Sequence, residues 1–209
     1  SPLRDASAFV QRIADRRITH VDLPPALLAL LDPELAPACL QTLVIGGEVA
    51  PAEVVEAWSD RCAVINVYGP TEATICSSLV RGQAQGWPEG HLGEPIAGIE
   101  YALEPSSGEL IISGAGVARG YLDEDGKLAA RFFVNDAGQP SYRSGDRARV
   151  DAQDNLIFGG RIDRQLKVDG RLVSPEEIEA AFTSHPICRR AYVFARESGR
   201  RQRLVAAVE

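Results

Sequence analysis

The sequence predicts an α/β fold in which a parallel α/β segment precedes a β-rich segment. Apolar runs that end at glycine or proline alternate with helical patterns over residues 1–90, which indicates a parallel sheet. Short strands and tight turns fill residues 91–162, a texture typical of a small antiparallel β-barrel or curved sheet. A hairpin, a capped helix and two further strands are expected over residues 163–209.

The α/β segment is expected to place its loops at one edge of the sheet. Ligands of parallel sheets gather beyond the carboxyl ends of the strands. The G-G-E run at 46–48 and the G-P-T-E run at 69–72 each follow a predicted buried strand, so this edge is the first place to look for chemistry. The expected helices cover residues 5–18, 26–31 and 51–59, and the expected strands cover residues 18–23, 40–47 and 62–69.

The last segment carries clear local signals. Asp169-Gly170 is expected to turn a hairpin. Ser174 is expected to cap a helix, with Pro175 in its first turn and two glutamates at the positive end of its dipole. Residues 190–196 and 203–208 are expected to be strands.

Composition excludes several classes of protein. A net charge of −7 and a pI near 5.1, without a lysine- or arginine-rich run, argue against nucleic-acid binding. No apolar run is long enough to cross a bilayer, and the start lacks a signal peptide's apolar segment. The four cysteines lack metal-ligand spacing, so we expect reduced thiols in a cytoplasmic protein; they are Cys39, Cys62, Cys76 and Cys188.

Four motifs occur in a fixed order and together resemble the adenylate-forming superfamily. They are N-V-Y-G-P-T-E (66–72), G-E-L-I-I-S-G-A-G-V-A-R-G-Y-L (108–122), Y-R-S-G-D (142–146) and G-R-I-D-R-Q-L-K-V-D-G (160–170). The set is most similar to the adenylation domains of non-ribosomal peptide synthetases. Leu172 and Ser174 depart from that pattern, and V-S-P-E-E-I-E is seen in some acyl-activating relatives.

The resemblance implies a division of the chain. Residues 1–162 correspond to the C-terminal part of the large subdomain, and residues 163–209 to an incomplete lid subdomain of α+β type. The family's phosphate loop, amine-binding aspartate and lid lysine have no counterpart among the 209 residues. We therefore expect these residues alone not to catalyse adenylation, whether they are a designed fragment, a proteolytic product or part of a split enzyme.

The resemblance also implies an ATP-dependent, AMP-forming ligase that uses Mg²⁺. Thr71 would contact the α-phosphate and Glu72 would hold the metal, an oxygen-ligand role that suits a hard cation. The alternative is that P-T-E only starts a helix with threonine as its cap. Tyr68 and Phe158 would sandwich adenine, with Gly47 and Val67 letting backbone approach its edge; Phe158 as a plain core residue is the alternative.

Asp146 would bind the ribose hydroxyls, and Arg161 would assist at the ribose or phosphate. A simple turn at Gly145-Asp146 and a surface salt bridge at Arg161 are the alternatives. Asp163 matches the hinge about which the lid rotates. Gly170 would lie near the tunnel of the carrier thiol, or serve as a plain hairpin glycine.

The substrate pocket is the least constrained prediction. By motif alignment its lining positions here are Asp22, Val44, Gly46, Val67, Ile75 and Cys76. Asp22 is expected to lie just inside a strand, where a buried carboxylate needs a partner. A basic amino acid such as arginine, ornithine or lysine would supply one; hydrogen bonds to backbone amides of its own loop are the alternative.

The expected partners follow from the same resemblance. They are an amino-acid substrate, a peptidyl carrier protein with its phosphopantetheine thiol, neighbouring synthetase domains and an MbtH-like activator. An antibiotic or siderophore would be the product class. An acyl- or aryl-CoA ligase of the same superfamily and a non-catalytic interaction module are the competing interpretations. The non-catalytic interpretation is disfavoured because the chain retains the predicted site residues Thr71, Glu72, Asp146 and Arg161.

Overall fold

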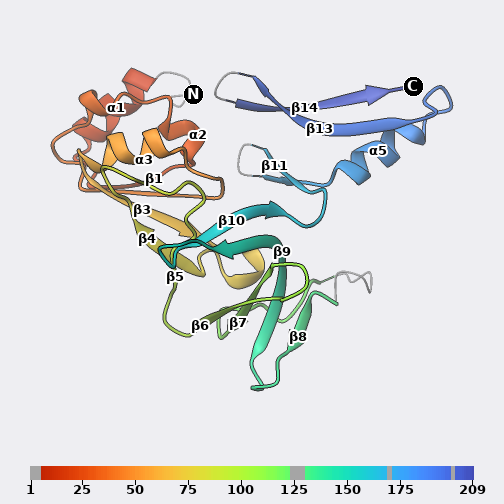
Figure 1. Ribbon diagram of the computed structural model, residues 1–209. Helices are drawn as coiled ribbons and strands as arrows, with labels where there is room; N and C mark the ends of the chain where they lie inside the picture. Colours follow the sequence, from red (N-terminus) through yellow and green to blue (C-terminus); the bar gives the residue numbers. More distant parts are fainter. Residues whose placement is uncertain (1–5, 123–129, 169–170, 199–200) are drawn as a thin grey trace. The chain divides into compact units, whose positions relative to one another are not determined.

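The computed structural model describes residues 6–122, 130–168, 171–198 and 201–209 (Figure 1). The chain divides into two compact units, residues 1–162 and 163–209. Within these described ranges, the first unit holds two sheets, and the second holds two antiparallel strand pairs and one helix. Among the described residues, no helix combines the length and the apolar character that crossing a bilayer requires.

The first sheet has five strands in the order β1-β2-β3-β4-β5. The first three pair in parallel, as the alternation of strand and helix predicts, and the last two pair antiparallel. The paired residues run in register from Asp22 through Val44 to Ile65. The strands are β1 (His20–Asp22), β2 (Thr42–Gly46), β3 (Ala63–Tyr68), β4 (Ser78–Arg81) and β5 (Glu94–Pro95).

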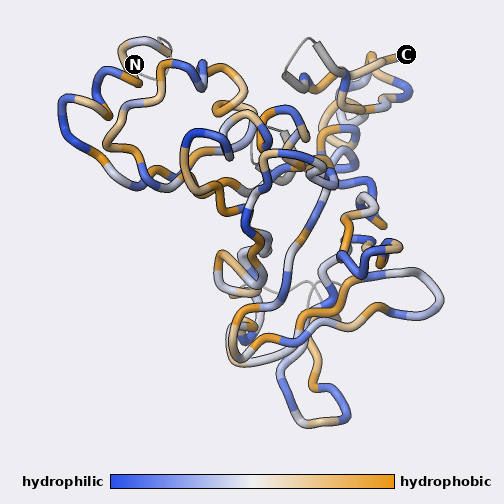
Figure 2. The backbone as a smooth tube through the Cα atoms, turned by 60° about the vertical axis from the view of Figure 1, so that its left-hand side comes forward, coloured by the Kyte–Doolittle hydropathy of each residue, from blue (hydrophilic) through white to orange (hydrophobic). Residues whose placement is uncertain are grey.

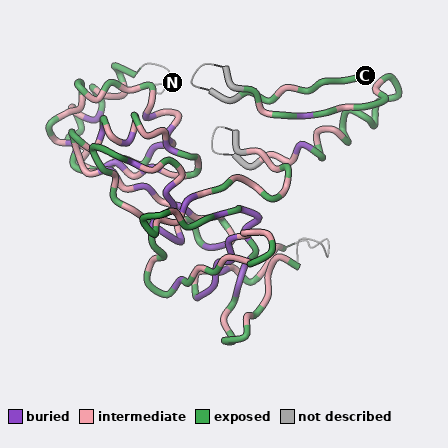
Figure 3. The backbone as a smooth tube through the Cα atoms, viewed as in Figure 1, coloured by how far each residue is buried: buried purple, intermediate pink, exposed green. Residues whose placement is uncertain are grey.

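Helices bury one face of this sheet. Alternate residues of β2 and β3 are buried, and buried segments of the backbone are purple in Figure 3. Leu43, Ile45 and Val64 form a core with Val55 and Trp58. The opposite face is left half-exposed. The helical elements of this part are α1 (Ala6–Asp15), α2 (Pro25–Leu28), α3 (Ala52–Ser59), and the short 3₁₀ turns η2 (Pro33–Leu35) and η3 (Thr71–Ala73).

The second sheet is antiparallel and open among the described residues, so the expected small barrel is a curved sheet here. Its order is β10-β9-β7-β6, and β8 also pairs with β9. The hydrophilic turn at 135–139, the lowest loop in Figure 2, is closed by two backbone amides that donate to Asn135 Oδ1. The strands are β6 (Ile99–Leu103), β7 (Glu109–Gly114), β8 (Phe132–Val134), β9 (Pro140–Val150) and β10 (Leu156–Arg161).

Pro175 and Val193 are the buried residues of the second unit among those whose burial the structure describes, residues 163–166, 173–196 and 203–209. The predicted cap is confirmed, because Ser174 Oγ accepts a hydrogen bond from the Glu177 amide. The elements are β11 (Leu166–Val168), β12 (Arg171–Val173), α5 (Pro175–Thr183), β13 (Ala191–Ser198) and β14 (Arg201–Val208), with each consecutive strand pair antiparallel.

Candidate functional site

The site is built where β3 ends and β9 and β10 run past it. Tyr68 is the last residue of β3, Asp146 lies in the middle of β9, and Arg161 ends β10. The Tyr68 hydroxyl donates to Asp146 Oδ2 at 2.5 Å, and Arg161 Nη1 donates to Asp146 Oδ1 at 2.8 Å. Three residues that the sequence names as nucleotide ligands therefore meet at one carboxylate.

The carboxylate of Asp146 is deeply buried. Asp146 is 2% exposed, and the Arg161 side chain is 13% exposed. Arg161 Nη1 also donates to the Ser144 carbonyl oxygen at 2.9 Å. Asp146 therefore does not mark a turn and Arg161 does not form a surface salt bridge, so both alternatives from the sequence are wrong.

Tyr68 stays protonated in this setting. Burial raises the pKa of its hydroxyl well above its ordinary value, and the negative charge of Asp146 raises that pKa further. A protonated hydroxyl is a donor, which is what the bond to Asp146 Oδ2 needs. Each oxygen of Asp146 accepts one hydrogen bond here and keeps a second lone pair, so the ribose role of Asp146 stays a prediction.

Phe158 packs against the hydrophobic cluster that contains Tyr68, Leu110 and Ala148, and it is half-buried. Its core-residue role and its adenine role are thus compatible. Gly47 follows β2 with φ of 82°, and a Cβ atom there would meet nothing within 4 Å. Open space beside its backbone fits the expected approach of a flat ring.

Thr71 and Glu72 lie in the 3₁₀ turn η3, which begins three residues after the last residue of β3. Pro70 occupies the cap position without a side-chain hydrogen bond, so the alternative in which Thr71 caps a helix is wrong. Thr71 is exposed and Glu72 is half-buried. Glu72 Oε1 accepts a hydrogen bond of 2.5 Å from the Tyr121 hydroxyl.

Tyr121 is a site residue that the sequence reasoning missed. It lies in the motif G-V-A-R-G-Y-L, which supported the resemblance without any residue role. Burial and the contact with Glu72 raise the pKa of its hydroxyl, so Tyr121 is a donor at any physiological pH. The tyrosine at this motif position is the sequence feature that could have identified Tyr121 as a site residue.

The donor chemistry of Glu72 fits Mg²⁺ as one ligand among several. Among the described residues no hydrogen bond reaches its second oxygen, Oε2, and no group of three or more His, Cys, Asp or Glu side chains could hold a metal alone. Mg²⁺ is commonly held by one or two carboxylates together with phosphate oxygens and water. A single carboxylate next to Thr71, the predicted phosphate ligand, matches that pattern.

The turn after η3 has an uncommon backbone. Thr74 and Ile75 both have left-handed φ, at 60° and 70°, although both side chains are β-branched. Ile75 is 81% exposed, and Cys76 is half-buried with its thiol 3.5 Å from the Ser78 carbonyl oxygen. The structure thus places these two predicted pocket residues in a strained turn next to the site.

Four other predicted pocket residues share the half-exposed face of the first sheet. Asp22 pairs with Val44, and Gly46 pairs with Val67, so all four side-chain positions point to the same side. Asp22 is exposed, which corrects the expectation of a buried carboxylate. Among the described residues nothing donates a hydrogen bond to its side chain, so the alternative bonds to its own loop are absent.

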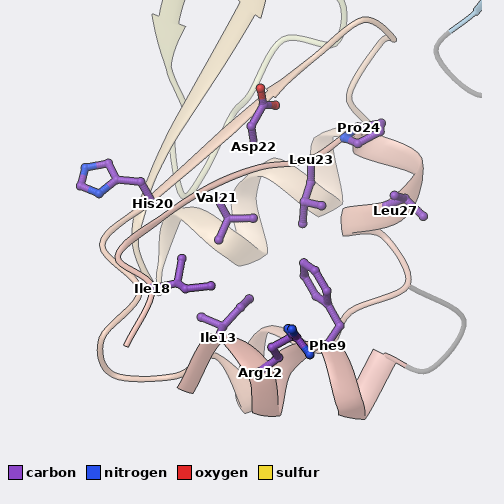
Figure 4. A pocket seen from close by; sticks show the side chains of 10 residues that line it. All are labelled: Phe9, Arg12, Ile13, Ile18, His20, Val21, Asp22, Leu23, Pro24 and Leu27. Atoms are coloured by element: carbon purple, nitrogen blue, oxygen red, sulfur yellow. The ribbon is translucent and has the colours of Figure 1, made fainter. Parts of the chain in front are cut away.

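An apolar pocket of about 520 Å³ lies on the other side of β1, between that strand and α1. Figure 4 shows the side chains of Ile13, Val21 and Leu23 directed into it, whereas the carboxylate of Asp22 points away. Alternation along a strand explains this division. Asp22 still belongs to the lining of this pocket, whereas Val44, Gly46 and Val67 do not.

Two remaining predictions concern the second unit. Asp163 is its first residue, and its Oδ1 accepts a hydrogen bond from the Gln165 amide at 3.2 Å. Gly170 lies outside the described residues. The roles of hinge and tunnel residue stay predictions.

Comparisons with known proteins agree with the geometry. A family model described as AMP-binding enzyme matches residues 1–122. The chain is 41% identical to the probable non-canonical nonribosomal peptide synthetase CymA of Salinispora arenicola, over 90% of this chain and 3% of that protein. It is 38% identical to novobiocin biosynthesis protein H of Streptomyces niveus, over 88% of this chain and 32% of that protein.

Solved structures show the same fold. PA1221, an NRPS protein containing adenylation and PCP domains, superimposes with a TM-score of 0.88 at 27% identity, over 98% of this chain and 39% of that one. The adenylation domain AlmE of Vibrio cholerae, in complex with glycyl-adenosine-5'-phosphate, gives 0.81 at 27% identity, over 95% and 42%. The chain thus spans less than half the length of each of these relatives.

Proposed function

The chain belongs to the AMP-binding enzyme family, as part of an adenylation domain of the nonribosomal peptide synthetase type, and we propose that it supplies the nucleotide-binding half of an amino-acid-activating ligase. The convergence of Tyr68 and Arg161 on the buried Asp146 carries this proposal. It sets an aromatic ring, a carboxylate and a guanidinium at the carboxyl edge of a parallel sheet, where such folds bind ligands.

Each group has a distinct task toward ATP. The rings of Tyr68 and Phe158 stack on adenine, next to the open backbone at Gly47. Asp146 accepts from the ribose hydroxyls, using lone pairs that Tyr68 and Arg161 leave free. Because Asp146 is buried here, the ring of Tyr68 or the guanidinium of Arg161 has to move outward when the ribose enters.

The reaction proposed has two balanced steps. A carboxylate oxygen of the amino acid attacks the α-phosphorus of ATP, and pyrophosphate leaves with the electron pair of the broken P–O bond. A thiolate then attacks the carbonyl carbon of the aminoacyl adenylate, and AMP leaves. Thr71 donates to an α-phosphate oxygen and Arg161 stabilises the added negative charge, so positioning and electrostatics supply the catalysis.

Glu72 is the residue that would hold Mg²⁺ in this scheme. When bound, the metal neutralises charge on the phosphate oxygens. The carboxylate of Glu72 follows Thr71 directly, so one short turn supplies both a hydroxyl for phosphate and an oxygen ligand for the cation. The exposure of Thr71 leaves its hydroxyl available.

A carrier protein is the proposed acceptor in the second step. PA1221, which contains adenylation and PCP domains, gives the structural precedent for such an arrangement. We propose Asp163 as the hinge at the boundary of the two units and Gly170 as a residue near the path of the phosphopantetheine thiol. Neighbouring synthetase domains and an MbtH-like activator are further proposed partners.

The substrate proposed is a basic amino acid. Asp22 is the charged member of the sheet face that it shares with Val44, Gly46 and Val67, and an exposed carboxylate without a partner among the described residues is available to a cation. The decisive measurement is pyrophosphate exchange by a longer protein that includes the phosphate loop. Preference for leucine over arginine, ornithine and lysine would rule out the basic substrate without touching the nucleotide proposal.

Calorimetric titration of the 209-residue chain with AMP tests the nucleotide proposal, with GMP as the control. We expect AMP to bind and an Asp146→Asn variant to bind it weakly. Absence of AMP binding by a folded chain would overturn the proposal. We also expect no pyrophosphate exchange by the 209 residues alone, since the phosphate loop and lid lysine of the family have no counterpart in them.

A further inference from the structure

The segment from Ala115 to Tyr121, here called the 115–121 loop, contacts the turn that carries Glu72 at three points. The Ala118 amide donates to the Glu72 carbonyl oxygen at 2.8 Å. The Thr74 hydroxyl donates to the Gly116 carbonyl oxygen at 2.7 Å. The Tyr121 hydroxyl donates to Glu72 Oε1 at 2.5 Å. The loop therefore holds both the backbone and the side chain of the turn.

The ring of Tyr121 is itself fixed. It makes an edge-to-face contact with Phe132, with ring centroids 5.2 Å apart, and Phe132 packs in turn on Tyr142 at 4.9 Å. Phe132 and Tyr142 belong to the same hydrophobic cluster as Tyr68. Packing of the Tyr121 ring on Phe132 fixes the position of the Tyr121 hydroxyl. The hydrogen bond from this hydroxyl therefore restrains the side chain of Glu72.

We propose that Tyr121 is a positioning residue for metal–nucleotide binding, which holds one oxygen of Glu72 so that the other is presented to Mg²⁺. The inference rests on the proposed role of Glu72. A free glutamate side chain loses rotamer entropy when it is fixed on a metal, and a hydrogen bond that fixes it beforehand removes part of that loss. Partners of this kind orient metal ligands in many proteins.

The strained turn adds a second reason for the loop. Two consecutive left-handed residues, Thr74 and Ile75, persist only where surrounding contacts hold them. The hydrogen bond from Thr74 to Gly116 is such a contact. The motif G-V-A-R-G-Y-L thereby gains a physical role as the brace of the phosphate and metal turn.

The test uses Tyr121→Phe in the 209-residue chain. This change keeps the ring on Phe132 and removes two contacts of the hydroxyl: the hydrogen bond donated to Glu72 and the longer 3.4 Å contact with the Tyr142 hydroxyl. Two affinities are measured: that of AMP in the presence of EDTA, by calorimetry, and that of Mn²⁺ in the presence of ATP, by electron paramagnetic resonance. We expect Mn²⁺ affinity to fall about tenfold, as for other lost partners of metal ligands, and AMP affinity to stay unchanged.

Tyr101→Phe is the matched control. Its hydroxyl lies 2.6 Å from Ser77 Oγ, and the residue packs on the same hydrophobic cluster without any described contact to Glu72. A general loosening of the unit would affect both variants alike, whereas positioning of Glu72 is specific to Tyr121. Equal Mn²⁺ affinities of the two variants would overturn the proposal.

Glu72→Gln separates the two layers of the inference. If Glu72→Gln weakens Mn²⁺ binding and Tyr121→Phe does not, the role of Tyr121 is wrong and the role of Glu72 stands. If Glu72→Gln leaves Mn²⁺ binding intact, the metal role of Glu72 is wrong and the inference falls with it. In the Glu72→Gln background we expect Tyr121→Phe to have no further effect on Mn²⁺ affinity.

Discussion

Tyr68 and Asp146 are 78 positions apart in the sequence, yet the tyrosine hydroxyl donates a 2.5 Å hydrogen bond to the aspartate carboxylate. This bond joins the end of the first sheet to the middle strand of the second. It therefore has two consequences: it ties the two sheets together, and it takes one of the two lone pairs on Oδ2 of the proposed ribose ligand. Removing the Tyr68 hydroxyl should therefore change the free energy of unfolding and the affinity for AMP in different ways.

Tyr68→Phe should lower stability without weakening nucleotide binding. The variant keeps the ring and leaves Asp146 Oδ2 without its donor, which costs about 1–3 kcal/mol for a buried charged acceptor. AMP should bind at least as tightly as to the parent chain, because one competitor for Asp146 is gone. Urea unfolding and calorimetry measure the two quantities. Weaker AMP binding would show that the hydroxyl itself contacts the nucleotide.

The raised pKa of Tyr68 predicts that the free energy of unfolding falls at alkaline pH. Its pKa is raised in the folded chain, so the unfolded chain releases the proton first. The stabilisation is complete below a pH of about 10, the ordinary pKa of tyrosine, and disappears as the pH rises toward the folded pKa. Unfolding free energies measured on both sides of that pH should show a smaller decline in Tyr68→Phe than in the parent.

Asp146→Asn should destabilise the chain because it removes the negative charge from the buried ion pair of Asp146 and Arg161. The guanidinium loses its counter-charge in a position where its side chain is 13% exposed. We expect a loss of about 2–3 kcal/mol in the free energy of unfolding, within the range for hydrogen bonds to charged groups. Urea unfolding measures it.

The double variant Asp146→Asn/Arg161→Gln provides the control for that prediction. Removing both charges removes the ion pair as a whole, so the double variant should regain part of the lost stability. AMP binding should stay weak in both variants. If the double variant loses more unfolding free energy than the two single variants lose together, Asp146 and Arg161 do not act as a stabilising pair.

Local signals in the sequence predicted most elements of the fold. The glycine and proline that end each apolar run mark β1, β2 and β3, and the Ser174 cap marks α5. Closure of the second sheet could not be predicted, because it depends on the register of β7, β9 and β10, and their pairings contain irregularities at Glu109/Ile111 and Phe158/Arg161. Long-range register has no local signature.

The candidate site divides in the same way. Residue types at motif positions indicated Tyr68, Asp146 and Arg161, and the structure joins them. The contact of Tyr121 with Glu72 spans 49 positions and depends on how the 115–121 loop folds back, so no spacing rule could reveal it. The exposure of Asp22 depends on which side of β1 the helices cover, and a three-residue strand shows too little alternation to decide that.

Gly46→Ala should be more harmful than Gly47→Ala, although only Gly47 has a positive φ. A Cβ at position 46 would lie 2.5 Å from the Val67 carbonyl oxygen, so two paired strands have to separate. We expect a loss of about 2–3 kcal/mol, as for other overpacked sites. At position 47 an alanine side chain would have free space, so Gly47→Ala costs only the strain of a left-handed φ of 82°, about 1 kcal/mol. Thermal unfolding ranks the two, and the reverse order would show that β2 and β3 are loosely packed.

His91 should make the first unit sensitive to mild acid. Its imidazole is buried against Trp87, with ring centroids 5.4 Å apart, and among the described residues Nδ1 has no hydrogen-bond partner. Burial lowers its pKa, and the nearby carboxylates of Asp151 and Glu94 oppose that shift only in part. The folded chain therefore binds a proton less readily than the unfolded chain.

Stability from His91 is present above its ordinary pKa, near 6.5, and is lost as the pH falls through the lowered folded value. The free energy of unfolding should thus decline between about pH 7 and 5.5, and His91→Gln should flatten that decline. His185→Gln is the control, since His185 is exposed on the second unit. Urea unfolding at several pH values measures the slopes. Equal slopes for His91→Gln and the parent would mean that the buried ring accepts its proton at no cost to the fold.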